Sequence, residues 1–89
     1  EGPAPTDELA RARAVVQQAD KASAQRYAAA DLQRAHEELQ SAERLNGQKK
    51  FDEARRAALA ASADANLAIA RGSAGEAQQA AQEIAKSND

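Results

Sequence analysis

One segment, residues 51–72, carries a three-four repeat of small side chains that constrains the fold more than any other feature. After Phe51, every member of the repeat is alanine or glycine: Ala54, Ala58, Ala61, Ala65, Ala68 and Gly72. Residues three and four apart lie on one face of an α-helix. Small side chains on that face let a neighbouring helix approach closer than the usual separation of about 8–10 Å. The repeat therefore predicts a helix packed closely on this side.

The same segment carries a second apolar stripe on another side of the helix, formed by Leu59, Ala63, Leu67 and Ala70. A helix that is apolar on two sides is expected at the centre of a fold. Leu32 and Leu39 of the preceding helix are the expected donors into the alanine repeat. The second stripe then has to contact the first helix or a second molecule. The sequence predicts an all-α fold, either an antiparallel three-helix bundle with a long third helix or a long hairpin that dimerises.

The first two helices are predicted from their own apolar spacing. One runs from residue 7 to about residue 24 with Thr6 as its N-cap, and its seam is Leu9, Ala12, Val16, Ala19 and Ser23. The next is capped by Asp31, ends at Asn46-Gly47, and has the seam Leu32, Ala35, Leu39 and Ala42. The two seams are out of phase by two residues, which is about 200° around a helix. We therefore expect a turn near residues 25–30, although a seam built on Val15 weakens this argument.

The third helix is predicted to start at Asp52 and to meet two glycines, Gly72 and Gly75. Each glycine costs about 1 kcal/mol in a helix interior. Either one long helix has a weak point near 72–75, or a separate helix spans 76–86; the single long helix is favoured. The expected organisation is a disordered lead at 1–6, a helical bundle domain at 7–86 and a frayed tail at 87–89.

Composition limits the classes of partner. Alanine accounts for 26 of the 89 residues, the net charge is −2, aromatic residues make up 2% and cysteine is absent. This balance favours neither nucleic-acid binding nor an anionic membrane surface. No run approaches the roughly 20 apolar residues that span a bilayer, so direct membrane insertion of this segment is not expected. Because alanine is the best helix former, a loosely ordered helical chain is the alternative to a packed bundle.

The titratable residues form no recognisable catalytic, cofactor or metal motif. His36 is the single histidine, whereas zinc sites usually take three or four protein ligands. The adjacent carboxylates, such as Glu37 and Glu38, point in different directions on a helix. We therefore expect no enzymatic activity, no cofactor and no metal. The candidate contact regions are the face formed by Leu59, Ala63, Leu67 and Ala70, and the turn residues Lys49, Lys50 and Phe51.

Two alanine-rich stretches, "YAAADLQRAHEELQSAE" and "FDEARRAALAASADANLAIA", flank Gly47. With these stretches, the chain from Leu9 to Arg71 resembles the alanine-rich domains of unknown function of the bacterial cell envelope. Such domains are typically periplasmic proteins or lipoproteins and often stand ahead of an OmpA-like domain. The resemblance implies a periplasmic location, with a lipidated cysteine upstream as one means of outer-membrane anchoring. It implies no peptidoglycan binding, because the OmpA-like part is missing here.

These observations predict a non-enzymatic structural or protein-interaction module of the bacterial cell envelope, which acts through a protein partner or through self-association. The alternative is a small inhibitor or immunity-type protein that acts on an envelope enzyme, with the turn at residues 46–53 as its contact.

Overall fold

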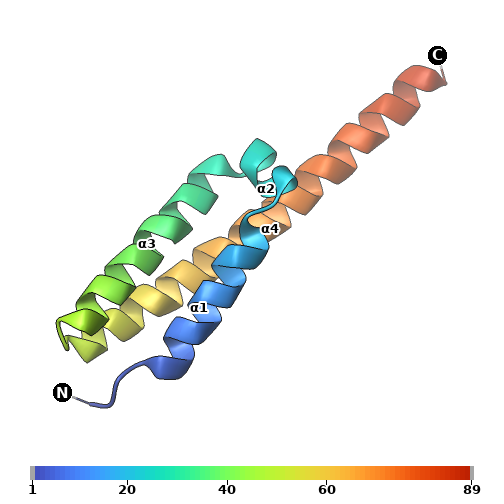
Figure 1. Cartoon of the computed structure of the whole chain (residues 1–89). Helices are drawn as coiled ribbons and strands as arrows, with labels where there is room; N and C mark the ends of the chain where they lie inside the picture. The colour runs from blue at the N-terminus through green and yellow to red at the C-terminus, as the bar shows by residue number, and fades with distance from the viewer. Residues whose placement is uncertain (1, 89) are drawn as a thin grey trace.

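The computed structural model describes residues 2–88, and four helices account for most of them. They are α1 (Thr6–Ala19), α2 (Ala22–Tyr27), α3 (Ala29–Gly47) and α4 (Phe51–Ser87). α3 runs antiparallel to both α1 and α4, and the short α2 crosses α4 where α1 ends (Figure 1). The prediction of an all-helical chain with a long last helix is confirmed. The number of helices differs from the prediction, because the segment after α1 forms a short helix of its own.

Two breaks, rather than one turn at 25–30, separate the first and second predicted helices. α1 ends at Ala19, five residues earlier than predicted, and Lys21 has an extended backbone with φ −128° and ψ 159°. The second break is at Ala28, inside the predicted window, with φ −143° and ψ 38°. The two breaks reorient the chain between the out-of-phase seams of α1 and α3. Ser23, predicted to lie on the first seam, is only half-buried in α2.

Each residue that was predicted to be an N-cap lies inside the helix instead of just before it. Thr6 is the first residue of α1, and Asp31 and Asp52 lie in the first turns of α3 and α4. No side-chain hydrogen bond caps any of these three helix starts. The acidic side chains in these first turns still interact favourably with the positive end of the helix dipole. The predicted N-cap residues thus located each helix start to within about three residues.

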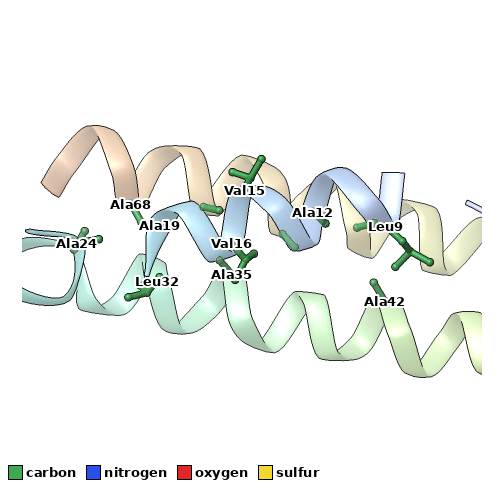
Figure 2. Packing of buried hydrophobic residues seen from close by; sticks show 14 residues of the cluster. Leu9, Ala12, Val15, Val16, Ala19, Ala24, Leu32, Ala35, Ala42 and Ala68 are labelled. Carbon is green, nitrogen blue, oxygen red and sulfur yellow. The ribbon is translucent and has the colours of Figure 1, made fainter. Parts of the chain in front are cut away.

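The alanine repeat of α4 forms the centre of the core. Ala54, Ala58, Ala61, Ala65 and Ala68 have no exposed surface, and Gly72 is buried. α1 and α3 both pack against this side of α4. The larger core residues come mainly from α1, where Leu9 lies toward Ala42 and Val16 toward Ala35 of α3 (Figure 2). Leu32 of α3 is buried, and Leu39 is partly buried against the same cluster.

α4 passes through the predicted weak point at 72–75 without a break. Its two glycines lie where α2 crosses, and a Cβ added to Gly72 would stand 2.8 Å from the backbone nitrogen of Ala24. A Cβ added to Gly75 would fall within the side chain of Tyr27, 2.6 Å from its Cβ. The glycines therefore serve close packing rather than ending the helix. The side chain of Tyr27 therefore packs between α2 and α4 at Gly75.

The N-terminal lead contacts α4, although the sequence predicts it to be disordered. Pro5 is fully buried, and the carbonyl oxygen of Pro3 accepts a 2.7 Å hydrogen bond from Nη2 of Arg55. Arg55 also contacts Glu8 at 3.2 Å. At the other end of the chain, α4 continues to Ser87, one residue into the predicted frayed tail. Residues 1 and 89, which belong to the predicted lead and tail, lie outside the described residues.

Candidate functional site

The predicted interaction face of α4 lies on the outside of the molecule. We call Leu59, Ala63, Leu67 and Ala70 the outer face; all four residues are exposed. Leu59 is 53% exposed and Leu67 is 37% exposed. Each member of the alanine repeat from Ala61 to Ala68 lies two residues before a member of this face, which places the two sides about 200° apart. α1 therefore does not cover the outer face, since it packs on the alanine repeat together with α3.

Ile84 extends this exposed apolar surface, which the sequence reasoning did not recognise. It is 63% exposed, and within residues 2–88 it joins Leu59 and Leu67 as an exposed large hydrophobic side chain. It lies 25 residues after Leu59, which corresponds to about seven helical turns, so the two share one side of α4. The signal was present in the sequence, because the three-four spacing of the outer face continues beyond Ala70.

The turn between α3 and α4 presents the second predicted contact. Lys49 and Lys50 are exposed and Phe51 is half-buried. Lys49 has a positive φ of 62°. Its N–H donates to the carbonyl of Asn46 at 3.0 Å, while the N–H of Lys50 donates to that of Leu45 at 2.9 Å. This is the Schellman pattern of a helix C-terminus, in which glycine usually takes the left-handed position. Gly47 was expected to end the helix in that role, but Lys49 takes it instead.

A carboxyl pair, Glu38 on α3 and Asp64 on α4, lies between the helices and was missed by the sequence reasoning. Oε1 of Glu38 is buried and has no hydrogen-bond partner among the described residues. Burial, together with the hydrogen bond and charge of the neighbouring Asp64, raises the pKa of Glu38 to about 7. Arg34 lies 3.9 Å from Asp64 and opposes this rise. Glu38 therefore exchanges its proton near neutral pH. The two residues are 26 positions apart on separate helices, so adjacency in the sequence does not reveal the pair.

Ion pairs hold the helices in register on either side of the carboxyl pair. Asp31, only 5% exposed, accepts a 2.8 Å hydrogen bond from Arg71 of α4 and a 3.4 Å hydrogen bond from Arg34. His36 lies 2.7 Å from Asp20 through Nε2, so it contacts the segment between α1 and α2. The Arg71 and His36 contacts each join two segments of the fold, whereas Arg34 and Asp31 both belong to α3.

A shallow groove of about 420 Å³ lies between the end of α1, α2 and α4. Its polar lining includes Gln18, Lys21, Ser23, Asn66, Ser73 and Glu76. In the part of the chain that the structure describes, no three histidine, cysteine, aspartate or glutamate side chains are grouped to hold a metal ion. No helix between residues 2 and 88 is both long and apolar enough to cross a membrane. The groove therefore supplies hydrogen-bonding groups from three helices.

The chain matches a protein family but no curated protein or solved structure. The search of curated proteins and the search of solved structures returned no significant match. Residues 7–84, which include all four helices except the ends of α1 and α4, match the model of a protein family. The chain is thus a member of the family described as Domain of unknown function (DUF4398).

Proposed function

We propose that this chain is a non-enzymatic helical module that binds protein through the outer face of α4. The observation that supports this proposal is the gathering of Leu59, Leu67 and Ile84, all exposed, on one side of a single helix. Scattered exposed hydrophobic side chains are normal on soluble proteins, but an aligned set marks a contact surface. The side of α4 opposite this face is already occupied by α1 and α3.

The bacterial cell envelope is the proposed location, with the periplasm as the compartment and an upstream lipid anchor as one means of attachment. Its support is the resemblance of residues 9–71 to alanine-rich envelope domains. The test is fractionation of the source cells with an antibody against this chain. Recovery in the periplasmic or outer-membrane fraction supports the proposal, and recovery in the cytoplasmic fraction contradicts it.

Site-specific photo-crosslinking in cells tests the proposed binding face. A photoreactive amino acid replaces Leu67 on the face or Gln82 off the face; both positions are exposed on α4. We expect adducts from position 67 in clear excess over those from position 82. Equal yields from the two positions would refute binding through this face.

The alternative function, inhibition of an envelope enzyme through the turn at residues 46–53, has weaker support. The positive φ of Lys49 belongs to the hydrogen-bonded end of α3 and needs no partner to explain it. The test is whether the chain slows a cell-wall lytic enzyme, with a Lys49→Ala/Lys50→Ala variant as the control. Slowing by the natural chain that the variant loses would favour inhibition over the module proposed above.

A further inference from the structure

The pair Asn46–Gly47 at the end of α3 contains the chemical groups for a spontaneous modification of the chain. In such a pair, the backbone nitrogen of the glycine is only a few bonds from the side-chain amide carbon of the asparagine. Attack of that nitrogen on the amide carbon closes a five-membered ring. Glycine favours the attack, because it has no Cβ to crowd the approach and its backbone turns freely. Asparagine is accordingly one of the thermally labile residues of proteins.

Gly47 presents its backbone nitrogen on an open side of the molecule. The residue is exposed, and a Cβ added to it would meet nothing within 4 Å. Gly47 is also the last residue of α3, so its N–H belongs to the final turn of the ladder that joins residues four apart. Opening of this one turn is therefore enough to free the nitrogen, and the rest of the helix can stay folded.

The amide side chain of Asn46 is not held in place through its oxygen. Oδ1 is buried and has no hydrogen-bond partner among residues 2–88. A buried amide oxygen without a donor costs free energy in the folded state. Rotation of the amide toward its own main chain therefore breaks no hydrogen bond at Oδ1, and it relieves this cost.

The conformation of Lys49 weakens the turn that protects the pair. Its φ of 62° lies in the left-handed region, which costs free energy in a residue other than glycine. The N–H of Lys49 donates to the backbone carbonyl of Asn46 itself at 3.0 Å. Breaking this bond releases the strain at Lys49 and loosens the end of α3 in one step. The last turn of α3 is therefore easier to open than a helix end closed by glycine.

We propose that Asn46 is a site of deamidation whose rate is set by opening of the last turn of α3. The nitrogen of Gly47 loses its proton to solvent and attacks Cγ of Asn46. The new N–C bond forms as the bond from Cγ to Nδ2 breaks, and Nδ2 takes a proton from water and leaves as ammonia. Water then opens the cyclic imide at either carbonyl, which gives an aspartyl or an isoaspartyl residue. Water is the sole co-reactant, nothing is oxidised or reduced, and the inference is independent of the outer face.

Either product alters the turn between α3 and α4. The new carboxylate lies in the last turn of α3, where the negative end of the helix dipole disfavours it. In the native side-chain position, one of its oxygens would be buried without a donor, as Oδ1 of Asn46 is. The isoaspartyl product also routes the main chain through the side-chain carbon, and it turns the carbonyl that Lys49 contacts into a free carboxylate. We therefore expect deamidation to loosen the turn that presents Lys49, Lys50 and Phe51.

Incubation of the purified chain in neutral buffer over several weeks tests the site. Ion-exchange chromatography resolves the products, because each event adds one negative charge to a chain of net charge −2, and peptide mass mapping locates the converted residue. We expect conversion at Asn46 and none at Asn66, which lies within α4 and is followed by the bulky Leu67. The chain unfolded in guanidinium chloride should convert Asn46 at least about tenfold faster, because the folded turn reacts only while it is open.

Two variants separate the reactivity of the pair from the opening of the turn. Gly47→Ala should slow conversion in the folded and the unfolded chain alike, because its Cβ crowds the attacking nitrogen. Lys49→Gly leaves the pair unchanged but relieves the left-handed strain, so it should slow conversion about two- to fivefold in the folded chain alone. An Asn46 that stays intact in the folded chain overturns the inference. Equal rates in the folded and unfolded chain also overturn it, as does a folded Lys49→Gly chain that converts as fast as the natural one.

Discussion

Gly72 lies where the backbone of α2 crosses α4, and Gly72→Ala is the sharpest test of that crossing. An added Cβ would stand 2.8 Å from the nitrogen of Ala24, 3.0 Å from the carbonyl carbon of Ser23 and 3.1 Å from the Cα of Ala24. Ordinary van der Waals contact begins at 3.4 Å, so α2 would have to withdraw by about 0.6 Å. The atoms it meets are backbone, so no side-chain rotation relieves the clash.

Two opposing effects set the size of the change. Overpacking of this kind typically costs about 1–3 kcal/mol. Replacing a glycine inside a helix with alanine contributes about 1 kcal/mol of stability. The expected result is a net destabilisation of about 1 kcal/mol. For a domain of this size that lowers the thermal midpoint by about 4–8 °C, measured by circular dichroism at 222 nm.

Gly47→Ala is the matched control, because it makes the same chemical change at a helical glycine. Nothing lies within 4 Å of a Cβ added there, and its φ is not positive. Helix propensity should therefore act alone and raise stability by up to about 1 kcal/mol. The reasoning is refuted if Gly72→Ala raises the melting temperature as Gly47→Ala does, because α2 could not then be pressed against α4 at this point.

Further predictions concern the helix end, the buried carboxylate and the carboxyl pair. Lys49→Gly should raise stability by up to about 1 kcal/mol in urea unfolding, because glycine adopts the left-handed conformation of this residue more easily. Arg71→Gln should lower stability by about 1–2 kcal/mol in the same assay, because it removes the shorter of the two cation contacts of the buried Asp31. An unchanged urea midpoint would show that Arg34 alone is enough to compensate the charge of Asp31. The folded-state pKa of Glu38, raised to about 7, implies a contribution to stability that is full below about pH 4.5 and is lost as pH rises through 7. Glu38→Gln should therefore match the natural chain near pH 5 and exceed it in stability at pH 8, and parallel stability profiles across that range would contradict the raised pKa.

The helices and their buried sides could be predicted from the sequence because both depend on local spacing. The alanine repeat of residues 54–68, the seams of α1 and α3, and the continuity of α4 all follow from periodicity and helix propensity. The outer face was recognised in the same way, and the structure places it in solvent. These features depend on which residues share one side of one helix, and the chain order specifies that information directly.

The tertiary structure decided the features that depend on contacts between distant segments. The break at Lys21 has no glycine or proline to mark it, the left-handed residue is Lys49 rather than Gly47, and Glu38 meets Asp64 only after two helices pack. Gly72 could be read as a weak point of α4, but α2 makes it a site of close backbone contact. The alanine repeat determined that a neighbour would approach closely, whereas the identity of that neighbour depended on how the whole chain packed. Helix periodicity is a local property, while a contact between helices is the lowest free-energy result of many competing packings.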